Sequence, residues 1–260
     1  MIDSHCHIDF DEFGTDRDAV LQRALAAGVE RLIIPSVHPQ YWARVVEYAS
    51  YCREHGVIAD YAIGLHPWWA DAFPLAELPA ALYAALEGAV AVGECGLDAL
   101  RDTPMSLQCE VLQCHIEAAI AHELPLILHC VKAHDTLLHL LKAAQPVAGG
   151  VIHGFAGSID IAQQYIALGF SIGVGGMVTR PHASRAQRAF KDLPLSALLL
   201  ETDAPAMPLW SESDQQLEGR NEPANIARIA TALSVLRDCD VNDVIAACQN
   251  NTQRLFRRMR

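Results

Sequence analysis

The sequence lacks any long uninterrupted apolar segment, although hydrophobic residues make up 52% of the chain. No stretch reaches the roughly 18 to 20 consecutive apolar residues that a membrane-spanning helix requires. Asp3, His5 and Asp9 interrupt the N-terminal region where a secretory signal peptide needs an apolar centre, so we expect no signal peptide. The apolar content is sufficient for a large buried core, and we expect no membrane partner.

Cysteine pairs with the spacing of metal or redox sites are also missing. The eight cysteines are scattered along the chain, and none belongs to a Cys-x-x-Cys pair. A chain of 260 residues does not depend on disulfides for a stable core. We therefore interpret the cysteines as reduced thiols and expect a cytoplasmic protein.

Positive charge is scarce. The chain has 19 lysines and arginines against 31 aspartates and glutamates, which gives a formal net charge of −12 at pH 7. This balance argues against broad nucleic-acid binding, which depends on a basic surface that displaces counterions. It does not exclude a nucleic acid as substrate, because bound divalent cations concentrate positive charge at one point. Metal would then supply the attraction that lysines do not.

The chain contains a repeated alternation of short apolar segments with amphipathic segments. Eight of the apolar segments have the nearly continuous character of strands buried on both faces, over residues 2–8, 31–37, 57–66, 89–94, 125–129, 150–153, 170–174 and 197–203. The intervening patterns predict helices, and two further helices, over 223–236 and 241–257, end the chain.

This alternation predicts an α/β fold with a closed parallel sheet. An open doubly wound sheet is the alternative, but the glycine-rich phosphate-binding turn after the first strand is missing. No internal linker or repeat interrupts the pattern, and the polar segment 207–221 is the longest predicted loop. We predict a single (β/α)8 TIM barrel over residues 1–260 with an additional C-terminal helix.

Several of the predicted strands end in a histidine or a carboxylate. These residues are His5 and His7 in the first strand, His66 in the third, Glu94 in the fourth, His129 in the fifth, His153 in the sixth and Asp203 in the eighth. The carboxyl ends of barrel strands meet at one mouth, where barrel active sites form. Each residue alone is explained by a hydrogen-bonded core position or a helix cap. Together, at the ends of apolar strands, they indicate a metal site.

The number of candidate ligands indicates more than one metal ion. His5, His7, Glu94, His129, His153 and Asp203 exceed what one four-coordinate zinc needs. They fit two divalent cations that share a carboxylate, an arrangement suited to displacement at phosphorus. Glu94, central in strand order, is the expected bridge, and Asp203 is the expected acceptor of the proton of the attacking water. Zinc, manganese and magnesium all suit this donor set.

At these residues the chain resembles the TatD family of metal-dependent hydrolases, and within it the YjjV-like branch. The matching blocks span nearly the whole chain in order, at residues 3–7, 64–67, 93–98, 129, 153–158, 201–205, 220–223 and 251–256. The resemblance implies a barrel with two divalent metals. It implies His5, His7, Glu94 and Asp203 around one metal and Glu94, His129 and His153 around the other. It also implies hydrolysis of phosphodiester bonds, with deoxyribonuclease activity as the family's best-known assignment.

One position departs from the family. The family commonly has an arginine two residues after the fifth-strand histidine, and this chain has Val131 there, with Lys132 beside it. We expect His66, Lys132 and Arg220 to bind substrate, although strand parity directs Lys132 away from the mouth unless the chain bends. Two aromatic residues, Trp68 and Trp69, leave two interpretations open, which are stacking on a base and packing of a loop.

Other residues near the predicted mouth are expected to have structural roles. Cys6, Cys95 and Cys130 adjoin proposed ligands but fall on the opposite strand face, so we interpret them as packed thiols. The four histidines in predicted helices, His55, His115, His122 and His139, are expected on the surface.

The leading hypothesis is a metal-dependent phosphodiester hydrolase, a deoxyribonuclease with DNA or a small phosphoester as substrate and no obligate protein partner. One alternative is hydrolysis of amide, lactone or ester bonds in a small molecule by the same metal pair. The acidic charge and Val131 favour this alternative, whereas Glu94 disfavours it, because related barrels with that chemistry often use a carbamylated lysine as the bridge. The second alternative is a non-catalytic metal-binding partner protein.

Overall fold

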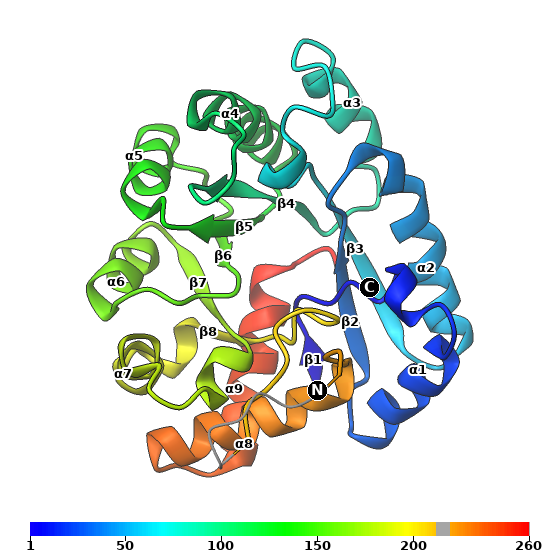
Figure 1. Ribbon diagram of the computed structural model, residues 1–260, viewed down its shortest axis with the longest axis vertical. Helices are drawn as coiled ribbons and strands as arrows, with labels where there is room; N and C mark the ends of the chain where they lie inside the picture. The colour runs from blue at the N-terminus through cyan, green and yellow to red at the C-terminus, as the bar shows by residue number, and fades with distance from the viewer. Residues whose placement is uncertain (212–218, 260) are drawn as a thin grey trace.

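Eight parallel strands form one sheet in the sequential order β1 to β8. The computed structural model describes residues 1–211 and 219–259. The strands are β1 (Ile2–Asp3), β2 (Arg31–Pro35), β3 (Ile58–Ile63), β4 (Ala91–Asp98), β5 (Leu126–Val131), β6 (Gly150–Ile152), β7 (Phe170–Val174) and β8 (Leu198–Leu200). The predicted TIM barrel is confirmed, and Figure 1 shows the strands in a ring with helices around them.

Helices follow the strands as the amphipathic segments predicted. The α-helices of the described residues are α1 (Arg17–Ala26), α2 (Trp42–Glu54), α3 (Leu78–Ala85), α4 (Met105–His122), α5 (His134–Ala144), α6 (Ile159–Ala167), α7 (Ser184–Asp192), α8 (Ile226–Arg237) and α9 (Val241–Leu255). Short 3₁₀ helices are η1 (Asp11–Phe13), η2 (Pro39–Tyr41), η3 (Pro67–Trp69), η4 (Gly176–Thr179), η5 (Leu195–Ala197) and η6 (Pro223–Asn225). Among the described residues, no helix combines the length and apolarity needed to cross a membrane.

The first strand is shorter than predicted, and individual hydrogen bonds replace its second half. Beyond Asp3, the backbone bonds to the β8 side through Ser4 N–H to Leu200 O (3.0 Å), Asp203 N–H to His5 O (2.9 Å) and His7 N–H to Ala204 O (2.8 Å). These bonds nearly close the barrel. They also fix both N-terminal histidines beside the end of β8, where Asp203 lies.

A buried carboxylate strengthens this junction between the start of the chain and the segment after β8. Asp3 accepts hydrogen bonds from the Thr202 backbone N–H (2.9 Å) and hydroxyl (2.5 Å), and Asp3 is fully buried. Burial penalises the charged form and raises the pKa of Asp3 to about 7. The start of the chain is thus joined to the segment after β8 by side chain as well as backbone.

The fourth strand extends beyond the predicted 89–94, because its pairing with β5 continues to Asp98 and Val131. Gly96 makes this close approach possible. Its φ of 142° lies in the region that favours glycine, and a Cβ atom there would stand 2.0 Å from the carbonyl oxygen of His129. The glycine therefore lets β4 place Glu94 close to His129.

The C-terminal helix covers the end of the barrel opposite the mouth. Phe256, directly after α9, is fully buried and packs with Ile33, Ala62 and Ile127 inside the barrel. It lies beside Arg31, the first residue of β2, which marks the amino-terminal end of the strands. Figure 1 shows α9, in red, across the ring of strands. The carboxyl-terminal end remains available for the site.

The predicted loop 207–221 falls partly outside the described residues. Its described ends are joined, since Asn221 Nδ2 donates to Met207 O at 3.1 Å. All eight cysteines are free, so the sequence-based interpretation of unpaired thiols is confirmed, while the cytoplasmic location stays a prediction.

Candidate metal centre

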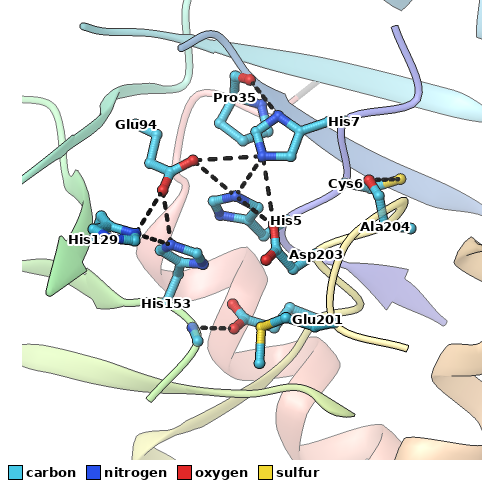
Figure 2. Close-up of polar contacts among 12 residues, drawn as sticks. His5, Cys6, His7, Pro35, Glu94, His129, His153, Glu201, Asp203 and Ala204 are labelled. Atoms are coloured by element: carbon cyan, nitrogen blue, oxygen red, sulfur yellow. Dashed lines mark hydrogen bonds and ion pairs between the residues drawn. The ribbon is translucent and has the colours of Figure 1, made fainter. Parts of the chain in front are cut away.

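The six predicted ligands converge at the carboxyl-terminal mouth of the barrel (Figure 2). They come from five places in the chain, with His5 and His7 after β1, Glu94 in β4, His129 in β5, His153 after β6 and Asp203 after β8. Three groups of three residues could each hold a metal ion, because the ligand atoms within each group lie within 4.8 Å of one another. The groups are His5–His7–Asp203, His5–Glu94–His153 and His66–Glu94–His129. Imidazole nitrogens and carboxylate oxygens at this spacing are the donors that zinc, manganese and magnesium accept.

Glu94 lies at the centre of the cluster and divides it in two. Its Oε2 is 3.2 Å from His5 Nε2 and 3.5 Å from His7 Nε2. Its Oε1 is 2.8 Å from His153 Nε2 and 3.3 Å from His129 Nδ1. The two oxygens of one carboxylate therefore face two different pairs of imidazoles.

Asp203 completes the group around His5 and His7. Its Oδ1 lies 3.5 Å from the Nε2 atom of each histidine, and these two nitrogens are 3.1 Å apart. His7 is oriented from behind by a 3.1 Å hydrogen bond between its Nδ1 and Pro35 O, which directs Nε2 into the cluster. One carboxylate and two imidazoles thus converge on one point.

Asp98 supports His129 from outside the cluster, a role that the sequence analysis missed. Its Oδ2 lies 3.3 Å from His129 Nε2 and accepts the indole N–H of Trp68 at 2.7 Å. Burial opposes the charge of Asp98, but its hydrogen bonds, first from His129 and then from Trp68, outweigh burial and hold its pKa well below its usual range. A signal was available, since Asp98 shares the Glu94 face of β4 by the two-residue strand period.

Glu201 holds the backbone that follows His153. Its Oε1 accepts the backbone N–H of Gly154, the residue after His153, at 2.5 Å. Gly173 makes room for this side chain, because a Cβ there would lie 2.4 Å from Glu201 Oε2. Burial raises the pKa of Glu201 to about 8. Glu201 lies in the segment 201–205, which resembles the family, but no sequence pattern indicated this contact.

His66, which was predicted to bind substrate, lies within the cluster itself. Its Nε2 is 3.1 Å from Glu94 Oε1, and its Nδ1 accepts the backbone N–H of Trp68 at 3.2 Å. The geometry therefore brings His66 as close to Glu94 as the predicted ligands. Its contact with substrate stays a prediction.

The predicted surface position of His115 is wrong. This α4 residue is fully buried, and its Nε2 accepts the Leu65 N–H at 2.9 Å while its Nδ1 pairs with Val111 O at 2.8 Å. Burial lowers its pKa to about 4, so it remains neutral and supports the segment before His66. The helical spacing from Val111 and Leu112 places position 115 on the apolar face, a signal that residue type alone obscures.

Two of the cysteines beside proposed ligands are packed as predicted. Cys6 and Cys95 are buried, and their thiols contact the carbonyl oxygens of Ala204 and Ile127, each at 3.8 Å. Cys130 differs, because it also lines the cavity over the metal cluster. No cysteine belongs to the ligand groups found among the described residues.

A cavity of about 590 Å³ opens over the cluster. Besides the histidines and carboxylates, its wall includes apolar and aromatic residues, among them Phe10, Val37, Trp68, Trp69, Val131 and Met207. Val131 thus contributes apolar surface to the wall. The cavity wall is therefore mostly apolar, whereas the histidines and carboxylates at its base are strongly polar.

The two predicted basic contacts differ in position. Arg220 is the one lysine or arginine among the described residues that line the cavity, but its guanidinium donates to Glu12 O (2.6 Å) and pairs with Asp16. Lys132 is exposed, has a φ of 54° just past β5, and is not part of the cavity wall. The chain does bend there, but both substrate contacts stay predictions.

Charges within the cluster stabilise one another. Burial disfavours protonated His7, but its hydrogen bonds with Asp203 and Glu94 outweigh burial and raise its pKa to about 10. Burial likewise opposes the charge of His153, and attraction to Glu94 outweighs it and raises that pKa to about 9. His5 behaves oppositely, because burial, reinforced by repulsion from His153, lowers its pKa to about 4. Without metal, His7 and His153 are therefore both protonated at neutral pH.

We expect metal binding to release these protons. His7 and His153 must each lose a proton before their nitrogens bind metal, so calorimetry in two buffers of different ionisation enthalpy should show release of about two protons or more near pH 7. Fewer should be released near pH 10. The raised pKa values stabilise the folded state fully only below the ordinary histidine pKa of 6.5, so the melting temperature of metal-free protein should fall progressively as pH rises from about 6.5 to 10. Identical heats in both buffers would contradict this expectation.

Comparison with known proteins places the chain in a family. The sequence matches the family described as TatD related DNase over residues 2–257. The metal-dependent hydrolase YjjV of Escherichia coli K12 is 40% identical over 260 residues, covering 98% of this chain and 97% of that protein. The 3′-5′ ssDNA/RNA exonuclease TatD of Erwinia amylovora is 31% identical over 262 residues, covering 98% and 99%. The crystal structure of Escherichia coli YjjV superposes with a TM-score of 0.90 at 39% identity, covering 99% of this chain and 98% of that one. This agreement along almost the whole chain, in sequence and in fold, shows that the protein belongs to the TatD family of metal-dependent hydrolases.

Proposed function

We propose that this hydrolase is a two-metal phosphodiesterase that cleaves single-stranded nucleic acid, with DNA as its main substrate. The observation that carries the proposal is the division of the Glu94 carboxylate, whose two oxygens face separate pairs of imidazoles. A shared carboxylate between two ligand groups is typical of paired divalent metals that act on phosphorus. The relative from Erwinia amylovora is named a 3′-5′ ssDNA/RNA exonuclease, which supports the same substrate class.

The donor set suits two metal sites. We assign His5, His7, Glu94 and Asp203 to one metal and Glu94, His129 and His153 to the other, with His66 beside the second group. Divalent metals bound there would lower the pKa of water and stabilise negative charge on the phosphate oxygens. Zinc, manganese and magnesium are all compatible with these ligands.

The chain's own residues supply proton transfer and orientation. Burial alone would raise the pKa of Asp203, but its hydrogen bond with His7 and the charge of His153 outweigh burial and hold the pKa below its usual range. Asp203 is therefore ionised at neutral pH and accepts the proton of the attacking water. Asp98 holds the ring of His129, and the apolar cavity wall limits the access of bulk water.

A second candidate is hydrolysis of a small-molecule ester or amide. The apolar wall at Val131 and the lack of an unengaged arginine in the described cavity wall favour it. We further propose that residues 1–260 act as one domain, since all eight strands that carry the site belong to one sheet.

The direct test is cleavage of a short single-stranded DNA by metal-stripped protein titrated with manganese, magnesium or zinc. We expect cleavage that depends on metal and saturates near two equivalents. Chromogenic phosphodiester and carboxylic ester substrates measured in parallel separate the two candidates. Absence of DNA and phosphodiester cleavage with two metals bound would defeat the nuclease proposal, and ester turnover would then establish the second candidate.

A further inference from the structure

Trp68 is held rigidly at the cavity wall without being buried. Its indole N–H donates to Asp98 Oδ2 at 2.7 Å, and the guanidinium carbon of Arg101 lies 3.5 Å from the ring centroid. Trp68 nevertheless remains 43% exposed and lines the cavity. Packing of a loop alone would hide such a ring, whereas a binding surface requires it to be fixed and accessible.

The surroundings of Trp68 favour a planar partner over a second anion. Trp69, Phe10 and Val131 add aromatic and apolar surface to the same wall. Arg220, the basic residue of the described wall, already interacts with Asp16. A cavity of about 590 Å³ lies within the range of small-molecule sites, about 300 to 1,000 Å³, and suits one compact unit rather than a length of duplex.

We propose that Trp68, backed by Arg101, is a subsite that stacks on a nucleobase whose phosphodiester lies at the metal cluster. The inference rests on the proposed phosphodiesterase function and adds recognition of the base to recognition of the phosphate. Aromatic side chains stack on any base, because every base presents a π-face, and a stacked arginine strengthens the contact. A base within a duplex has both faces covered by its neighbours, so this subsite selects an unpaired nucleotide.

Trp68 is also connected to the metal cluster. The Asp98 Oδ2 atom that accepts its N–H is the atom that contacts His129 Nε2. Loss of Trp68 therefore has two separable consequences. A disturbed His129 would slow every substrate by the same factor, whereas a lost stacking surface would slow only substrates that carry the base.

The test is a double-mutant cycle between the tryptophan and the base. Wild-type protein, Trp68→Ala and Trp68→Phe are assayed on the dinucleotide d(TpT) and on its two analogues with an abasic tetrahydrofuran residue at one end. For the analogue that lacks the stacked base, we expect wild type to lose about 5- to 150-fold in kcat/KM. Trp68→Ala should show little further decrease in kcat/KM when d(TpT) is replaced by that analogue. Trp68→Phe should show a decrease between those of wild type and Trp68→Ala.

Trp210→Ala is the matched control. Trp210 also stacks with an arginine, since the guanidinium carbon of Arg180 is 5.1 Å from its ring centroid, but Trp210 is not part of the described cavity wall. This variant should keep the wild-type response to base removal. The stacking proposal is overturned if, for both abasic analogues, the decrease in kcat/KM relative to d(TpT) is the same in wild type and in Trp68→Ala.

A binding measurement tests the subsite without hydrolysis. Thymidine 5′-monophosphate and 2-deoxyribose 5-phosphate, which differ by the base, are titrated into metal-loaded wild type, Trp68→Ala and Trp210→Ala by calorimetry. We expect wild type and Trp210→Ala to prefer the nucleotide, and Trp68→Ala to lose that preference. A wild-type protein that cleaves no d(TpT) defeats the proposed function, while an unchanged preference in Trp68→Ala defeats the stacking inference.

Discussion

Replacing Glu94 by glutamine is expected to lower kcat/KM for phosphodiester hydrolysis by about 1,000-fold or more. The amide keeps the size of the side chain but replaces one ligating oxygen by an N–H donor, which repels a cation. Because the two oxygens of Glu94 face different imidazole pairs, a single substitution weakens both ligand groups. Steady-state kinetics and metal analysis of the purified variant should show loss of both activity and bound metal.

The same substitution should also lower the stability of the metal-free protein near pH 7. His153 would lose its main buried anionic partner and His7 one of its two, and breaking a buried pair in this way costs about 3–5 kcal/mol before the imidazoles release their protons. The exposed Glu87→Gln variant is the matched control and should resemble wild type. A Glu94→Gln protein with wild-type turnover and metal content would refute the central role of this carboxylate.

Replacing Asp203 by asparagine is expected to lower kcat by about 100- to 10,000-fold with a small change in KM. The amide does not accept the proton of the attacking water. Asp203 has a φ of 56°, and asparagine tolerates this left-handed conformation well, so the fold should be preserved. The group formed by Glu94, His129 and His153 should still bind metal, which metal analysis would detect.

The control for this variant is Asp238→Asn. Asp238 ends α8, is exposed, and has a φ of 53°, so it experiences the same chemical change in the same backbone conformation. Its melting temperature and kinetics should match wild type. If folded, metal-loaded Asp203→Asn loses less than about tenfold in kcat, Asp203 is not the proton acceptor.

The barrel and the gathering of its polar residues were predictable because both depend on local pattern. Continuous apolar segments between amphipathic segments predict parallel strands buried on both faces, whatever the details of their packing. Once the strands are parallel and consecutive, their carboxyl ends meet at one mouth. Residues as distant as His5 and Asp203 are therefore placed near each other by their positions at strand ends alone.

The arrangement within the cluster depended on contacts between distant elements. No sequence pattern specifies which oxygen of Glu94 faces which histidine, since that follows from side-chain rotamers and the close approach at Gly96. The supporting bond from Asp98 to His129 likewise joins two strands. Such contacts are set by the packing of several elements at once.

The fold, the family resemblance and the set of residues gathered at the mouth follow from the amino-acid sequence alone, because they depend on periodicity and on chain order. The hydrogen bond from the Leu65 backbone to His115 and the pairing of Arg220 with Asp16 follow from the packing of distant elements. Only the tertiary structure decided that Trp68 is fixed yet exposed. The burial of a side chain and its pairing with a partner depend on which residues of other elements pack against it, and those contacts form only in the folded barrel.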